Sequence, residues 1–334
     1  MIYRQFLPIC NPEFCRKFMS NMENNHSASS SMGHHPMFSF FVLLLFTFAG
    51  LFVGNIVGLV SILPFYDFSL EAASEFLSHP MADASGRVPL LLVQGMASFC
   101  AFIIAPLAYL IYFEKKGLNQ FSAMAQPMLP AVLLTILISQ SFMFLNTPII
   151  EWNLNLEFPS FMSGFEEYAQ SQEAYLKEIT EFVTQFDNIG QFLLAVIIVA
   201  VLPGVGEELL FRGLIQQKLI GFLGNPHVAI WIAGFIFGLF HFQFYGLVPR
   251  MLLGVLFGYL YWWSGSLLLA MIAHFFNNGF TLLMVYLYQQ GAVKFDIEGT
   301  SEIPMSTVLV AGVIFGSLFY TFVRFVKHQE IVYE

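Results

Sequence analysis

Long apolar runs recur along this 334-residue chain, and most are near the roughly 20 residues that an α-helix needs to cross the hydrocarbon core of a membrane. Only 10% of the residues are charged, against roughly 25% in an ordinary soluble domain. The predicted fold is therefore all-α, a polytopic membrane helical bundle of about eight transmembrane helices. We place these helices at residues 38–63, 88–112, 128–150, 189–221, 226–243, 247–264, 266–289 and 304–326.

The segments between the runs suggest three regions. Residues 1–36 are polar, lack the order of elements found in a signal peptide, and are predicted to be a flexible cytoplasmic N-terminal tail. Residues 37–188 are predicted to hold the N-terminal transmembrane helices with amphipathic loop segments, and residues 189–328 a second helical core. Within 151–190, EEYAQSQEAYLKEITEFVTQF has apolar residues at helical spacing between acids, which predicts an amphipathic helix outside the membrane.

The distribution of Lys and Arg predicts the orientation, because short basic loops tend to stay in the cytoplasm. With the N-terminus inside, nine of the 13 basic residues fall on the cytoplasmic side, namely Arg4, Arg16, Lys17, Lys115, Lys116, Arg212, Lys218, Arg324 and Lys327. Most acids then lie in external loops, so the net charge of −9 describes those loops and predicts no nucleic-acid partner. We expect a multi-pass protein of the lipid bilayer with both termini in the cytoplasm.

Three ionisable residues, Glu207, Glu208 and Arg212, interrupt the fourth apolar run in the stretch GEELLFRG. Each charge near the bilayer centre costs on the order of 2.5–3.5 kcal/mol, so these residues must pair or face a polar interior. Glu208 and Arg212 are four residues apart in the favourable acid-first order and are predicted to form a supporting ion pair. Glu207 points about 100° away and has no local cation, which makes it the candidate general base. Taken alone, the three charges fit a salt-bridged patch at a helix end equally well.

Just before these charges, Pro203 and Gly204 predict a local kink and a close helix approach. After them, the turn GFLGNP reverses the chain. Glu207 lies 18 residues before Asn225 and His241 lies 16 after it, so an antiparallel hairpin at about 1.5 Å per residue places the acid and the imidazole at the same depth.

His274 and Asn278 form a second polar pair, four residues apart on one face of an otherwise apolar helix. Asn277 is one position off that face and is the weaker candidate. A single membrane histidine is more often a hydrogen-bonded structural residue, but two histidines, an asparagine and a charged cluster on three helices favour a functional site.

The chemistry of these groups is that of water-mediated peptide hydrolysis. A carboxylate and an imidazole can hold and deprotonate a water molecule. An imidazole N–H and an amide N–H can stabilise the oxyanion formed when that water attacks a carbonyl. Neither a G-x-S-x-G elbow nor an H-E-x-x-H zinc pattern is present.

In order and in apolar context, three motifs of this chain resemble those of the CPBP intramembrane proteases, the CAAX protease and bacteriocin-processing (Abi/Rce1-like) family. They are Glu207-Glu208-x-x-x-Arg212, Phe237-x-x-x-His241 and His274-x-x-x-Asn278. The resemblance covers about residues 189–290 and is closer to the bacterial branch. It implies an eight-helix core, with a cavity reached from the cytosol or the membrane, in the bacterial cytoplasmic (cell inner) membrane.

The resemblance also implies a function, that of an intramembrane endopeptidase hydrolysing a peptide bond in a membrane-associated peptide or protein, with residues 189–328 as its catalytic helical core. Glu207 and His241 would activate water, and His274 and Asn278 would form the oxyanion site. No cofactor is firmly predicted. Two histidines and a glutamate leave zinc as an alternative, although Asn278 would be an unusual ligand.

Two other functions fit the same residues. One is a non-catalytic bacteriocin-immunity or peptide-binding membrane protein. The other is a transporter in which Glu207 and His241 relay protons, although we find none of the internal repeats that mark many transporters.

Overall fold

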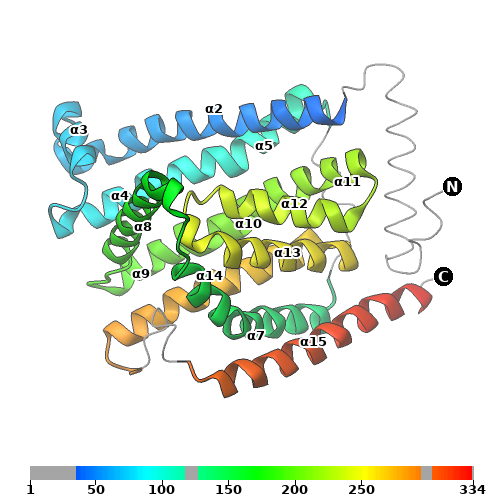
Figure 1. The fold of residues 1–334 in the computed structure, drawn as a ribbon. Helices are drawn as coiled ribbons and strands as arrows, with labels where there is room; N and C mark the ends of the chain where they lie inside the picture. The colour runs from blue at the N-terminus through cyan, green and yellow to red at the C-terminus, as the bar shows by residue number, and fades with distance from the viewer. Residues whose placement is uncertain (1–34, 117–126, 295–302, 333–334) are drawn as a thin grey trace.

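The computed structural model describes residues 35–116, 127–294 and 303–332. The predicted tail of residues 1–36 lies outside the described residues, apart from its last two. All regular elements of the described residues are helical, so the predicted all-α class is confirmed. The helices run alongside one another as a bundle, and α2 begins and α15 ends on the same side of it (Figure 1).

The α-helices and the shorter helical segments follow one another along the chain. In the first half they are α2 (Pro36–Ile62), η2 (Leu63–Tyr66), α3 (Leu70–Ser78), η3 (Ala84–Gly86), α4 (Arg87–Phe99), η4 (Cys100–Ile104), α5 (Ala105–Ala108), η5 (Tyr109–Phe113), α7 (Leu129–Leu154), η6 (Ser160–Met162) and α8 (Ser163–Val183). In the second half they are α9 (Ile189–Ala195), η7 (Val196–Val201), α10 (Leu202–Glu208), η8 (Leu209–Gln216), α11 (Gln217–Leu223), α12 (Pro226–Leu239), η9 (Phe244–Gly246), α13 (Leu247–Ser264), α14 (Leu267–Gln289) and α15 (Met305–Val332).

Seven helical stretches of the described residues are long and apolar enough to cross a membrane. They are Pro36–Tyr66, Ala84–Phe113, Leu129–Leu154, Ile189–Leu223, Phe244–Ser264, Leu267–Gln289 and Met305–Lys327. The predicted helix at 226–243 is the exception, because α12 has only 14 residues, short of the roughly 20 that a full crossing needs. It stops early because the chain turns after Phe240, and Phe242 adopts a left-handed backbone conformation (φ 54°) that no α-helix accommodates.

The faces of α2 show why this bundle suits a membrane. Its buried positions are largely small or polar, such as Thr47 and Gly54. Large apolar side chains point outward instead, with Leu45 67% exposed and Phe52 69% exposed. Small residues allow helices to pack closely, and a long apolar helix with large apolar side chains on its outer face is suited to contact with lipid. The chain is therefore an integral membrane protein that crosses the bilayer several times.

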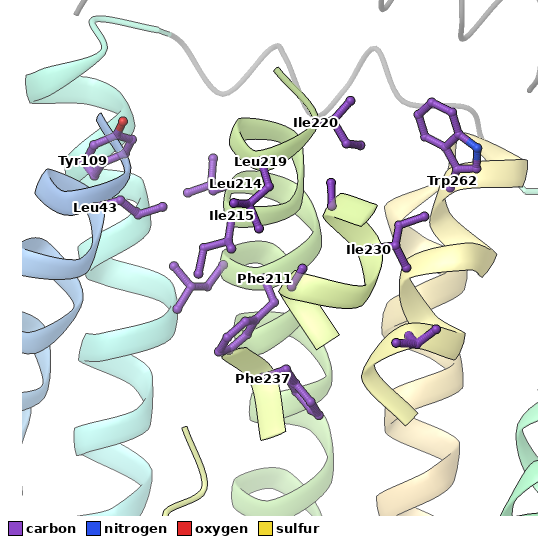
Figure 2. Close-up of a cluster of buried hydrophobic side chains, with 14 of the residues drawn as sticks. Leu43, Tyr109, Phe211, Leu214, Ile215, Leu219, Ile220, Ile230, Phe237 and Trp262 are labelled. Atoms are coloured by element: carbon purple, nitrogen blue, oxygen red, sulfur yellow. The ribbon is translucent and has the colours of Figure 1, made fainter. Parts of the chain in front are cut away.

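A packed apolar cluster forms where α2, η8, α11, α12 and α13 meet (Figure 2). Leu43 of α2, Ile215 of η8 and Ile230 of α12 are fully buried in it. The rings of Phe211 and Phe237 meet edge to face, with their centroids 5.2 Å apart. Because η8 begins directly after Glu208 and itself contains Arg212, this cluster anchors one side of the polar site.

The predicted amphipathic helix within 151–190 is confirmed as α8. It carries several acids, and only Ala169 and Val183 are buried along its length. It does not belong to the helices apolar enough to cross a membrane. In Figure 1, α8 lies obliquely across the bundle, close to α4 and to the loop that precedes α13.

Candidate active site

Glu207, Glu208 and Arg212 lie within one continuous helical stretch, in which α10 is flanked by two π-helical segments, η7 and η8. The predicted kink at Pro203 therefore takes the form of a widened helix. Proline has no N–H, so the carbonyl of Val199, four residues earlier, lacks its usual α-helical partner. Such π-segments are frequent at functional sites.

A close helix contact brings the charged residues to the helix that bears His274. A Cβ added at Gly204 would lie 3.2 Å from the backbone nitrogen of Phe275 and 3.3 Å from the carbonyl oxygen of Met271. The absence of a side chain at Gly204 thus lets α10 pack directly on α14. The close approach expected at this glycine is present.

Glu208 is the centre of a buried polar network. Its Oε1 lies 2.7 Å from Nη1 of Arg212, and the two side chains are 0% and 1% exposed. The same oxygen lies 2.8 Å from Nδ1 of His274 on α14. Arg212 also donates from Nη2 to the carbonyl of Gly254 on α13, at 2.8 Å. One carboxylate therefore ties together three helical segments, with the ion pair at the predicted four-residue spacing.

Aromatic rings enclose this network. The guanidinium of Arg212 lies 4.5 Å from the ring centre of Phe237 and 5.3 Å from that of Phe257. The ring of His274 stacks on Phe257 at 5.1 Å, while Phe237 meets His274 at 5.9 Å and His241 at 5.1 Å. The ring of Phe237 therefore contacts both predicted histidines. The two phenylalanine rings stabilise the buried guanidinium of Arg212 through cation–π contacts and exclude water around it.

His241 and Glu207 each present an open acceptor. Nδ1 of His241 lies 2.9 Å from the carbonyl oxygen of Phe237. A carbonyl can only accept, so we assign the proton to Nδ1, which leaves Nε2 of the neutral ring free to accept one. Oε2 of Glu207 is buried and has no hydrogen-bond partner. Neither imidazole is hydrogen-bonded to Glu207 in this structure, so the predicted pairing of Glu207 with His241 is not formed directly.

Asn278 is bonded to the helix that carries the acids. Its Nδ2 donates to the carbonyl of Val199 at 3.0 Å, the carbonyl that Pro203 leaves without its α-helical partner. Its Oδ1 accepts from Nδ2 of Asn277 at 3.2 Å. One amide hydrogen of Asn278 is therefore committed to the fold, and the second is what remains for an oxyanion. Asn277, the weaker candidate, reaches the site only through Asn278.

Sequence reasoning missed that α13 supplies backbone carbonyls as hydrogen-bond acceptors for the side chains of η8. Gln216 donates from Nε2 to the carbonyl of Gly258 at 3.3 Å, one turn beyond the bond from Arg212 to Gly254. The signal was present in the sequence, since Gly254-x-x-x-Gly258 is the small-residue spacing that lets membrane helices approach closely. The close approach exposes two backbone carbonyls to side-chain donors from η8.

The zinc alternative finds no ligand set. Across residues 35–116, 127–294 and 303–332, no group of three or more His, Cys, Asp or Glu side chains is placed to hold a metal ion. Oε1 of Glu208 is instead bonded to both Arg212 and His274, while its Oε2 has no hydrogen-bond partner.

A comparison with protein families points to the same part of the chain. Residues 189–280 match the family described as type II CAAX prenyl endopeptidase Rce1-like. An 84-residue stretch is 31% identical to the uncharacterized protein YpbD of Bacillus subtilis (strain 168), covering 24% of this chain and 40% of that protein. The match thus spans less than half of this relative. No solved structure matches the chain.

The matched segment contains every residue predicted for the site, namely Glu207, Glu208, Arg212, His241, His274 and Asn278. Of these, Arg212, His241 and His274 lie against the rings of Phe237 and Phe257. Glu208 is bonded to Arg212 and His274, and Asn278 to the carbonyl of Val199. The resemblance predicted from the three motifs is therefore confirmed for this segment: residues 189–280 are similar to the Rce1-like family of type II CAAX prenyl endopeptidases.

Proposed function

We propose that this protein is an intramembrane endopeptidase in which Glu207 is the general base. The observation that carries the proposal is the buried, unpartnered Oε2 of Glu207, on a carboxylate that has neither the ion pair to Arg212 nor the bond to His274 that Glu208 makes through its Oε1. A buried carboxylate oxygen without a partner is costly, and such groups persist where they serve function. The match of residues 189–280 to a protease family supports the same assignment.

In the proposed reaction, a water molecule binds between Oε2 of Glu207 and Nε2 of His241. Glu207 takes one proton while the water oxygen forms a bond to the carbonyl carbon of the peptide. The C–N bond then breaks, and the same proton passes from Glu207 to the leaving amine. The products are a carboxylic acid and an amine, and no group on the enzyme is consumed.

The negative charge that develops on the carbonyl oxygen needs donors, and His274 and Asn278 can supply them. Nδ1–H of His274 is held by Glu208. When the ring is doubly protonated, its Nε2–H is available for the oxyanion. The second amide hydrogen of Asn278 is the other donor. Glu208 and Arg212 thus act as a supporting pair that orients His274.

The proposed substrate is a membrane-associated peptide or protein. We place both termini of the enzyme in the cytoplasm and the enzyme in a bacterial cytoplasmic membrane, because the basic residues gather on that side in the predicted topology. The arrangement in Figure 1, with α2 beginning and α15 ending on one side of the bundle, is consistent with it.

The test is the substitution Glu207→Gln in the purified full-length protein, incubated with a peptide library with and without a chelator. We expect cleavage to fall by about two to four orders of magnitude, the usual contribution of a general base, with unchanged thermal stability. Glu178→Gln, an exposed acid on α8, is the matched control and should cleave normally. Full cleavage by Glu207→Gln would refute the proposal, and peptide binding without cleavage by the wild type would favour the immunity alternative.

A further inference from the structure

The loop that carries His241 is connected to α8 by a row of polar side chains. Gln243, two residues after His241, donates from Nε2 to Oε1 of Glu173 at 3.0 Å. Its Oε1 accepts from Nη2 of Arg250 at 2.5 Å. The side-chain amide of Gln243 therefore bridges an acid of α8 and a base of α13, next to a predicted catalytic histidine.

Glu173 is placed unlike most other acids of α8. Its neighbours at helical spacing, Ala169 and Leu176, are buried and half-buried, so it lies on the inward face of the helix. By contrast, Glu167, Glu178 and Glu181 are exposed. The second oxygen of Glu173, Oε2, is buried without a partner, and so is Nη1 of Arg250. A charged side chain that faces inward and is only partly paired lowers the stability of the fold. We therefore expect Glu173 to have a role other than keeping the surface soluble.

The loop itself needs external support. Phe242 has a left-handed backbone (φ 54°), which is sterically unfavourable for a residue with a large side chain. Asn153 of α7 holds the following residues, accepting from the backbone N–H of Val248 at 2.9 Å and donating to the carbonyl of Phe244 at 3.2 Å. A Cβ at Gly246 would collide with the guanidinium of Arg250, so this glycine leaves room for the bridge.

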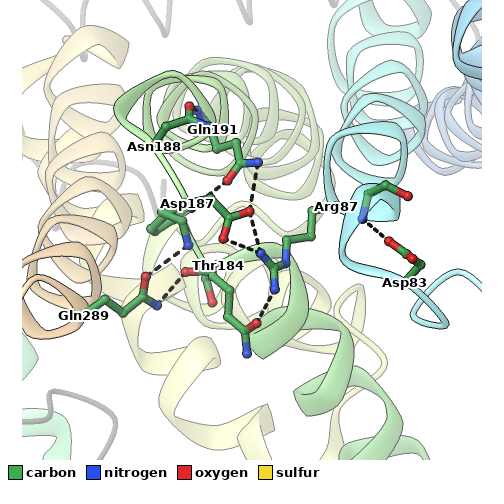
Figure 3. Close-up of polar contacts among 10 residues, drawn as sticks. Asp83, Arg87, Thr184, Asp187, Asn188, Gln191 and Gln289 are labelled. Carbon is green, nitrogen blue, oxygen red and sulfur yellow. Dashed lines mark hydrogen bonds and ion pairs between the residues drawn. The ribbon is translucent and has the colours of Figure 1, made fainter.

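Helix α8 is held firmly enough to position another element (Figure 3). After its C-terminal end, Asp187 forms an ion pair with Arg87 of α4 at 2.8 Å. Gln289, at the end of α14, donates to the carbonyl of Thr184 at 2.8 Å and accepts from the N–H of Phe186 at 3.1 Å. Because α14 also bears His274, these bonds fix α8 relative to the helix that supplies the second histidine.

We propose that Glu173 is a positioning residue for the active site, acting through Gln243 on the loop that presents His241. This inference rests on the proposed function, and it makes α8 a part of the enzyme's working site. Its bond to Gln243 holds the strained loop in the conformation that keeps Nδ1 of His241 on the carbonyl of Phe237. Nε2 then keeps a fixed direction, on which the alignment of the attacking water depends. Misplacement by about 1 Å can cost on the order of 100-fold in rate.

The test compares Glu173→Ala with Glu173→Gln in the full-length protein, using a peptide that the wild type cleaves. The Ala variant loses the acceptor for Gln243, so we expect kcat to fall by about 10- to 100-fold with KM within about twofold. The Gln variant keeps Oε1 as an acceptor and should retain kcat within about threefold. Glu178→Ala, on the exposed face of the same helix, is the matched control and should leave kcat unchanged.

Gln243→Ala provides a second route if Glu173→Ala does not fold, and it should show the same loss of kcat at constant KM. An unchanged kcat in the folded Ala variants, or a Gln variant as impaired as Glu173→Ala, would overturn the inference. Glu207→Gln in the same assay separates the two proposals. A fully active Glu207→Gln refutes the proposed mechanism, whereas an inactive Glu207→Gln beside a fully active Glu173→Ala refutes only the positioning role.

Discussion

Two arginine networks in this bundle differ chiefly in their distance from water. Arg212 and Glu208 are almost completely buried among aromatic rings. Arg87 and Asp187 form an ion pair of nearly the same length at an end of α4, with side chains 12% and 62% exposed. Water can replace a lost partner in the second pair but not in the first. The same contact distance therefore carries very different consequences for stability.

The largest effect is expected from breaking the buried network. Arg212→Ala leaves the carboxylate of Glu208 with a single neutral or charged histidine as its partner, and removing one member of a buried pair costs about 3–5 kcal/mol. We expect this loss in the free energy of unfolding, measured by denaturant titration in detergent. The double variant Glu208→Gln with Arg212→Ala should recover part of it, since no uncompensated charge remains. If Arg212→Ala lowered the free energy of unfolding by less than about 1 kcal/mol, the buried network would contribute no more to stability than the exposed one.

An intermediate case is the cluster at the end of η5. Glu114 accepts from the hydroxyl of Tyr109 at 2.5 Å, lies 2.7 Å from Nζ of Lys116 and forms an ion pair with Lys218. Burial alone raises the pKa of Glu114, but the two ammonium groups outweigh it and bring the pKa to about 2, against an ordinary value of 4.5. The two cations therefore favour the charged carboxylate even though it is largely buried.

This shift predicts a pH dependence with a definite sign. Because the folded state holds the proton of Glu114 less tightly than the unfolded state, the stabilisation is fully present above about pH 5 and is lost as the pH falls toward 2. Its size is on the order of 3 kcal/mol. The unfolding temperatures of wild type and Glu114→Gln should differ at pH 7 and converge near pH 2. A difference that stays constant with pH would contradict the prediction.

The smallest effect is expected at the exposed pair. Asp187→Asn removes the charge that faces Arg87, and exposed ion pairs contribute only about 0–1 kcal/mol. Arg87 keeps the bond from its Nη2 to Gln185 and its position over the ring of Phe182. We expect a change below about 1 kcal/mol in the free energy of unfolding, decreasing further as salt is added. A loss as large as that of Arg212→Ala would show that the two networks are equally essential.

Local spacing predicted much of this molecule. The apolar runs located the helices to within a few residues, and the four-residue spacing of Glu208 and Arg212 predicted their ion pair. The predictions failed where the backbone conformation of a turn, or contacts between residues far apart in the sequence, determine the structure. Helix α12 ends at Leu239 because of the turn before Phe242, and the kink at Pro203 became two π-segments around α10.

The contacts that define the candidate site could not be read from spacing. His274 bonds to Glu208, which lies 66 residues earlier, whereas sequence reasoning paired Glu207 with an imidazole. Which of two adjacent carboxylates meets the histidine depends on how α10 is rotated against α14, and the close contact at Gly204 sets that rotation. The inward position of Glu173 depends likewise on the docking of α8.

By itself, the sequence determined that this chain is a helical membrane protein, and its three polar motifs determined which family the segment 189–280 resembles. Those properties follow from hydrophobicity and helical periodicity, which act within about twenty neighbouring residues. Tertiary structure alone decided that Glu208 is the shared partner of Arg212 and His274, and that Glu207 keeps a free oxygen. Hydrogen bonds depend on differences of about 1 Å, and only the packing of complete helices fixes positions that finely.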